Sequence, residues 1–233
     1  KTSLPRPQDI EDVYNAIARQ GYTHVIVLMI AECLSSANNL MRLAAEEHPE
    51  LTVKVFDSKS ASIGLGALAV QVARYAVRGV AFDPLCELTK RLIDDTVVYF
   101  SLDTLEYLQR GGRIGRATAL AGGLLQIKPI LTFDRKDGMI STAAKVRGRR
   151  GVQQRLIELA TELAAKHPGE EYNLVVCDGN VPEEGAALEA ALTRALPNAH
   201  RVLHGKIDAT MAVHLGPNLL GVGVQFLNSK LPA

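Results

Sequence analysis

The feature that most constrains the fold is a continuous apolar run at residues 24–30, which lies between two segments of helical periodicity. A run of this kind, rich in Val and Ile and without polar alternation, is typical of a strand covered on both faces. A further strand is expected at 51–57, and helices are expected at 7–20, 36–47, 64–78 and 83–94. Strands that alternate with helices of this length need crossover connections, so we predict an α/β domain built on a parallel sheet.

After residue 95 the pattern changes, because strand-like runs follow one another with short connections. Asp137-Gly138 lies between two such runs and predicts a hairpin. Strands are expected at 97–101, 128–133, 139–146, 172–177, 200–205, 208–214 and 219–226, and helices at 104–110, 149–166 and 183–195. We therefore predict a two-domain α/β protein, with a parallel-sheet domain at 1–95 and a domain with a mixed or antiparallel sheet at 96–233.

The composition excludes several classes of function. Lys and Arg number 26 against 25 Asp and Glu, so no overall field attracts nucleic acid, and the absence of Trp leaves little material for stacking bases. No apolar stretch reaches the length of a bilayer span. Three Cys residues without metal spacing argue against a zinc site or a disulfide framework and fit a reducing cytosol. We expect a cytoplasmic protein with no metal, no nucleic-acid partner and no stable membrane insertion.

Several polar residues lie where a bound anion could be held. Thr2 and Ser3 precede a proline-stiffened turn, and Ser35 follows the apolar strand and opens a helix, at the sheet edge where α/β proteins bind ligands. From spacing alone, helix capping explains Thr2 and Ser3 better, and at Ser35 it is an equal alternative. Arg113 stands in Gly111-Gly112-Arg113-Ile114, where glycines allow close backbone approach and an arginine can grip a carboxylate or phosphate, or simply lie exposed on a structural loop.

Two enzymatic interpretations remain open from the residues alone. In the first, Ser35 or Cys33 acts as a nucleophile with His214, which ends the strand expected at 208–214; no GxSxG elbow is present. In the second, Gly64-x-Gly66 belongs to a dinucleotide-binding oxidoreductase. The first glycine lies several residues after the strand, so close helix–sheet packing explains these two glycines better.

Taken in order, the motifs resemble those of the DegV family of bacterial fatty-acid-binding proteins. They are Thr2-Ser3-x-Pro5-x-Pro7, Leu34-Ser35, Asp57-Ser58, Gly111-Gly112-Arg113-Ile114, Lys128-Pro129-Ile130, Asp137-Gly138, Val146-Arg147 and His214-x-Gly216-Pro217. The resemblance covers nearly the whole chain. It implies that a long-chain fatty acid lies in an apolar tunnel between the two domains. It also implies a carrier without catalytic chemistry or a cofactor, which presents the acid to a fatty acid kinase for phospholipid synthesis.

The resemblance also implies roles for individual residues. Thr2, Ser35 and His214 match positions that hold the fatty-acid carboxylate, whereas Ser3, Arg113 and Arg147 match positions near the head group or the kinase surface. Three departures from the family pattern are expected to matter. Glu32 lies near a position where the family has serine, Asn218 replaces a glycine after His214-x-Gly216-Pro217, and the family's segment before the Thr2 motif is expected to be lacking.

Overall fold

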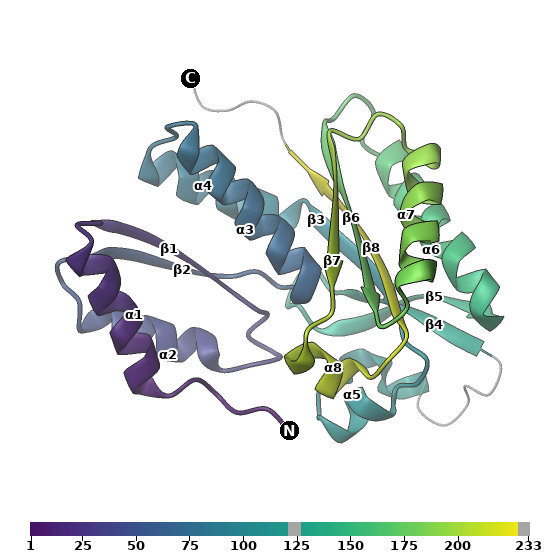
Figure 1. Cartoon of the computed structure of the whole chain (residues 1–233), viewed down its shortest axis with the longest axis horizontal. Helices are drawn as coiled ribbons and strands as arrows, with labels where there is room; N and C mark the ends of the chain where they lie inside the picture. Colours follow the sequence, from purple (N-terminus) through teal and green to yellow (C-terminus); the bar gives the residue numbers. More distant parts are fainter. Residues whose placement is uncertain (121–126, 228–233) are drawn as a thin grey trace.

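Two parallel strands between two pairs of helices form the N-terminal part of the computed structural model, which describes residues 1–120 and 127–227 (Figure 1). Side chains of the first strand alternate: Val25 and Val27 pack towards α1 and α2, and Ile26 and Leu28 pack towards α3 and α4. Helices on both faces thus explain the continuous apolar run. The elements are α1 (Pro7–Arg19), β1 (His24–Met29), α2 (Ala37–Glu46), β2 (Thr52–Asp57), α3 (Ser62–Val77) and α4 (Phe82–Asp94), with β1 and β2 paired in parallel.

A six-stranded mixed sheet forms the rest of the described structure, in the order β5-β4-β3-β8-β6-β7. Only β6 and β7 pair in parallel, and every residue of β6 and β8 is buried. The strands are β3 (Thr96–Ser101), β4 (Ile127–Phe133), β5 (Ile140–Arg147), β6 (Tyr172–Gly179), β7 (Arg201–Lys206) and β8 (Leu219–Phe226). The helices are α5 (Glu106–Arg110), a 3₁₀ helix (Gly115–Leu120), α6 (Gly148–Ala165), α7 (Pro182–Ala195) and α8 (Ala209–Leu215), with α6 and α7 packed together against the sheet (Figure 1). The predicted α/β class with one parallel and one mixed sheet is confirmed, while residues 121–126 and 228–233 of the expected second domain lie outside the described part.

The strand predicted at 208–214 is wrong, because this segment forms the helix α8. The Asp208 carboxylate accepts the amide of Met211 at 2.8 Å and so caps the first turn. Gly216 follows the helix with φ at 71°, a conformation that glycine adopts without strain. The cap at Asp208 and the stop at Gly216 thus bound a short helix, and His214 lies on it and not at a strand end.

The tip of the β4–β5 hairpin contacts the loops that follow β1 and β2. Gly138 has φ at 72°, and a Cβ on it would lie 2.8 Å from the Cβ of Ala31 and 3.0 Å from the Cα of Lys59. Arg116 holds the same tip through Asp137, with Nη2 2.5 Å from Oδ2. A side chain at position 138 has no room, so this glycine lets the large sheet approach the polar loops of the N-terminal part.

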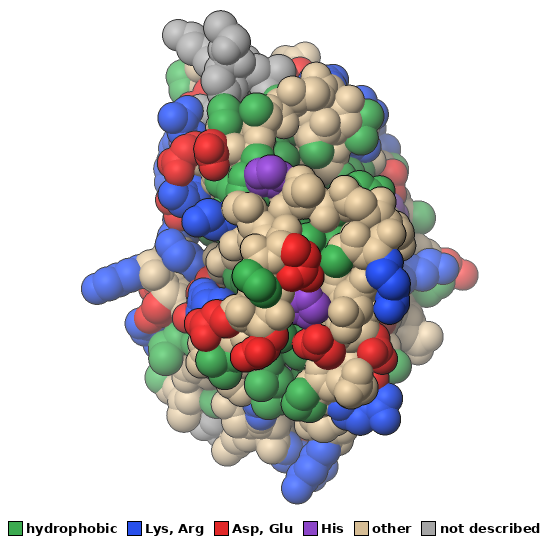
Figure 2. Space-filling model, turned by 90° about the vertical axis from the view of Figure 1, so that its left-hand side faces the viewer, with side chains coloured by type: hydrophobic (Ala, Val, Ile, Leu, Met, Phe, Trp, Pro, Cys, Tyr) green, Lys and Arg blue, Asp and Glu red, His purple; other side chains and the backbone are tan. Residues whose placement is uncertain are grey.

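Basic and acidic side chains are interspersed on the face shown in Figure 2. Within residues 1–120 and 127–227, no helix is long and apolar enough to cross a membrane. The same residues contain no group of three or more His, Cys, Asp or Glu side chains that could hold a metal ion.

Candidate ligand pocket

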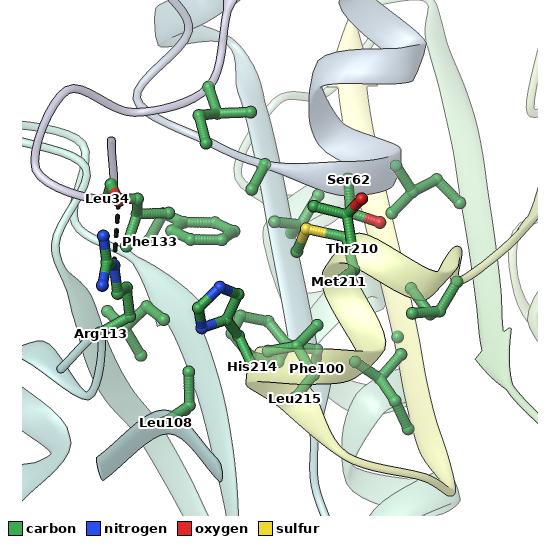
Figure 3. A pocket seen from close by; sticks show the side chains of 18 of the residues that line it. Leu34, Ser62, Phe100, Leu108, Arg113, Phe133, Thr210, Met211, His214 and Leu215 are labelled. Carbon is green, nitrogen blue, oxygen red and sulfur yellow. Dashed lines mark hydrogen bonds between the residues drawn. The ribbon is translucent and has the colours of Figure 1, made fainter. Parts of the chain in front are cut away.

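A cavity of about 350 Å³ lies where the N-terminal loops, the large sheet and α8 meet (Figure 3). Its wall is mostly apolar, and no Asp or Glu belongs to it among the described residues. The wall comes from both sides of residue 95, with Leu34 and Ile63 on one side and Phe100, Phe133 and Met211 on the other. A concave apolar cavity with a few polar groups is what a largely hydrophobic small molecule requires.

Five of the six residues singled out from the sequence line this cavity. They are Thr2, Ser3, Ser35, Arg113 and His214. They come from the N-terminal segment, the β1–α2 loop, the loop after α5, and α8. Arg147 is the exception: it lies exposed at the end of β5, opposite Ile127, and is not part of the lining.

Thr2 and His214 are joined by a direct hydrogen bond, although 212 positions separate them. Thr2 Oγ1 lies 2.8 Å from His214 Nε2. His214 Nδ1 is shielded from solvent without a hydrogen-bond partner, and it lies against Gly111, where an added Cβ would approach it to 2.6 Å. Burial lowers the pKa of His214, and the charge of Arg113 lowers it further. The imidazole is therefore mainly neutral near pH 7.

Arg113 supplies the positive charge of the lining. Its Nε donates to the carbonyl oxygen of Leu34 at 3.1 Å, and its Nη1 donates to that of Gly111 at 2.6 Å (Figure 3). These two bonds hold the guanidinium between the β1–α2 loop and the loop after α5. Among the described residues no carboxylate pairs with Arg113. The pocket thus presents a fixed cation without its counter-ion.

Ser35 and Glu32 share the β1–α2 loop but face different surroundings. Ser35 Oγ lines the pocket and accepts the amide of Ala37 at 3.3 Å. The Glu32 carboxylate lies 2.5 Å from Arg42 Nη2 and is not part of the lining. An ion pair with α2 thus keeps this acid out of the pocket, where it would repel an anionic ligand.

The apolar interior includes residues that the sequence did not single out. Cys177 on β6 and Gly221 on β8 lie side by side, and a Cβ at Gly221 would come within 2.7 Å of Cys177 Sγ. Burial raises the pKa of Cys177 to about 12, so the thiol behaves as an apolar group. Ser62 and Thr210 add two hydroxyls to the wall (Figure 3). In the sequence these residues look like ordinary strand and helix residues, and only the tertiary fold brings them together.

The geometry disfavours the hydrolase interpretation. Within the described residues, His214 bonds Thr2 and forms no hydrogen bond with Ser35 or Cys33. Cys33 lies outside the pocket lining, and burial, Asp57 and Asp137 raise the pKa of its thiol. Neither candidate nucleophile has the adjacent base that nucleophilic catalysis needs.

The dinucleotide interpretation also lacks a structural basis. Gly64 packs closely, since a Cβ on it would meet Ser60 Oγ at 2.2 Å and Val98 Cγ1 at 3.2 Å. Gly66 is open, with nothing within 4 Å, so the close packing expected for both glycines holds for Gly64 alone. The tight strand-to-helix turn of a dinucleotide site is absent here, because four residues separate β2 from α3.

Comparison with known proteins decides the family. The family model described as "Uncharacterised protein, DegV family" matches residues 1–227. The chain belongs to the DegV family. A DegV domain-containing protein of Clostridium acetobutylicum is 35% identical over 222 residues, which cover 95% of this chain and 77% of the relative. One from Clostridium perfringens is 34% identical over 224 residues, or 96% of this chain and 78% of the relative.

Solved structures of the DegV family share the fold described above. A DegV family protein from Thermus thermophilus, described by its fatty acid binding, superimposes with a TM-score of 0.90 at 30% identity, covering 97% of this chain and 79% of the other. A stearic acid-binding protein from Eubacterium ventriosum has a TM-score of 0.88 at 27% identity, covering 97% and 78%. DegV from Bacillus subtilis, described as a fatty acid binding protein, has a TM-score of 0.86 at 28% identity with the same coverage.

Proposed function

We propose that this DegV chain binds a long-chain fatty acid, with its acyl chain in the apolar cavity and its carboxylate at Thr2, Ser35 and His214. The observation that carries the proposal is a cavity whose wall, among the described residues, has no Asp or Glu and bears hydroxyls, an imidazole and the guanidinium of Arg113, which has no carboxylate partner there. Burial of each CH₂ group contributes about 0.8 kcal/mol, so the acyl chain of the ligand supplies most of the binding free energy. A desolvated carboxylate needs several hydrogen-bond donors. Ser3 and Arg113 line the same pocket and add donors to those of the three residues named above.

Native mass spectrometry of the protein expressed in bacteria tests this function. The expected result is a mass increment that matches one acyl acid and that disappears on denaturation. A preparation that carries no acyl acid and takes none up when titrated with palmitate or oleate contradicts the proposal. Co-purification of a dinucleotide instead would restore the oxidoreductase alternative.

The chain is proposed to act as a cytoplasmic carrier, not as an enzyme, and to present the acid to a fatty acid kinase for phospholipid synthesis. A carrier needs no base and no nucleophile, and the pocket offers neither in a reactive arrangement. The three Cys residues are free thiols, as expected in a reducing compartment. Arg147 is exposed outside the pocket, where it can contact a partner protein without touching the ligand.

Arg147→Glu is expected to leave fatty-acid affinity unchanged and to lower the rate of acyl phosphate formation by the kinase about tenfold. A reversed charge at the proposed contact with the kinase would oppose docking. Affinity is measured with a fluorescent fatty acid, and the rate is measured with the purified kinase at subsaturating carrier. Arg19→Glu on α1, also exposed, is the matched control. Equal losses of affinity and rate would place Arg147 at the ligand, contrary to the proposal.

Fatty-acid binding is expected to take up a proton at His214. Burial in the pocket holds the pKa of this imidazole below its usual value, whereas a bound carboxylate beside it would raise that pKa. The affinity should therefore increase as the pH falls through the pKa of the complex and level off below the pKa of the empty protein. Calorimetry near pH 7 in two buffers of different ionisation enthalpy measures the uptake.

His214→Gln should abolish this proton uptake, and a fatty alcohol of the same chain length should bind the wild-type protein without it. Proton uptake that persists in the His214→Gln protein would assign the proton to another group. The same conclusion would follow if binding of the alcohol took up as many protons as binding of the acid.

A further inference from the structure

Three arginines lie near one another where α3 ends and the edge strand β7 begins. Arg74 and Arg78 are one helical turn apart at the end of α3, and Arg201 begins β7. Asn173 of β6 links the two elements: it pairs with Arg201 in the sheet, and its Nδ2 donates to Gln71 Oε1 at 3.3 Å, one turn before Arg74. None of the three arginines lines the pocket.

These arginines lack a counter-charge. No acid of the described residues forms an ion pair with any of them, and nearby Glu171 is paired with His200 at 2.7 Å. Arg74 Nη1 is shielded from solvent and has no acceptor. Buried donors in folded proteins nearly always have one. Burial lowers the pKa of Arg74, and the nearby charges of Arg201 and Arg78 lower it further.

We propose that Arg74, Arg78 and Arg201 form a binding site for a phosphate group, either free or esterified. Each guanidinium is a planar fork of donors that matches pairs of phosphate oxygens. A single carboxylate would be satisfied by one such fork, whereas three forks and three positive charges suit a dianion with several oxygens. The anion would give Arg74 its missing acceptor and relieve the repulsion among the three side chains. This site is separate from the fatty-acid pocket and takes a different ligand.

Thermal unfolding of the whole chain, with inorganic phosphate replacing chloride at constant ionic strength, tests the site. Saturating phosphate is expected to raise the Tm of the wild-type protein by about 5 °C beyond its general salting effect. The double variant Arg78→Gln/Arg201→Gln lacks two of the three arginines, so phosphate is expected to raise its Tm by the general salting effect alone. Arg194→Gln on α7 removes an exposed arginine elsewhere and should retain the full increment. Glycerol phosphate in a second series shows whether an esterified phosphate binds as well as the free ion.

Arginine side-chain NMR signals give a readout that does not depend on stability. Titrated phosphate should shift the Nε–Hε signals of Arg74, Arg78 and Arg201 with one saturating curve. The proposal fails if the double variant shows the same Tm increment as the wild-type protein. It fails equally if these three signals do not move while others do, or if their shifts increase without saturation.

Discussion

Replacing Thr2 by Val together with Ser35 by Ala is expected to weaken fatty-acid binding about a hundredfold. Both hydroxyls line the pocket, and Thr2 is already held by His214 at 2.8 Å, so its oxygen is positioned before the ligand arrives. A hydrogen bond to a charged group contributes about 1.5–3 kcal/mol, and each 1.4 kcal/mol changes the dissociation constant tenfold. Loss of two such bonds accounts for the expected effect, which fluorescent-ligand displacement measures directly.

The fatty alcohol of equal chain length is the control for this double substitution. It keeps the acyl contacts but carries no charge, so its affinity should fall far less than that of the acid. Thr2→Val preserves the shape of the side chain but removes its bond to His214, and Ser35→Ala removes the bond from the Ala37 amide. Each bond contributes about 0.5–1.5 kcal/mol, so the Tm should fall by only a few degrees. Unaltered affinity for the acid would remove both hydroxyls from the carboxylate site, and equal loss for acid and alcohol would indicate a damaged pocket.

Most of the architecture could be predicted from local patterns, because strand and helix periodicities act over a few residues. The apolar run that became β1, with Val25 and Ile26 facing opposite helix pairs, is such a case. The strand predicted at 208–214 is wrong. The run resembles a strand, but the Asp208 cap and the glycine at 216 favour a helix. Competing local signals of similar strength are where pattern analysis fails.

The site could be predicted only in part, because its contacts join distant parts of the chain. Order and spacing drew attention to Thr2 and His214, yet nothing in the sequence states that their side chains touch. Cys177 read as one residue of a buried strand, and its place beside Gly221 in the cavity depends on how β6 pairs with β8. The departure at Glu32 was resolved by the ion pair with Arg42, a contact between a loop and the helix that follows it.

Met211→Trp is expected to weaken fatty-acid binding by about tenfold to a hundredfold through its effect on cavity space alone. Met211 lies on α8 with its side chain among the pocket residues (Figure 3). A larger indole would occupy space that the acyl chain needs, and overpacking of this kind costs about 1–3 kcal/mol. The carboxylate donors stay unchanged, so acid and alcohol should lose affinity equally, in contrast to the Thr2/Ser35 variant.

Val213→Trp provides the matched control on the same helix. Val213 is 41% exposed and lies outside the lining, so a Trp there tests helix propensity and surface change without filling the cavity. Ligand displacement and thermal unfolding are measured for both variants. Retained affinity in Met211→Trp would mean that the acyl chain does not pass α8, and equal losses in the two variants would mean that any disturbance of this helix weakens binding. Only a loss of affinity that occurs in Met211→Trp but not in Val213→Trp, and that is equal for acid and alcohol, places the acyl chain in this cavity.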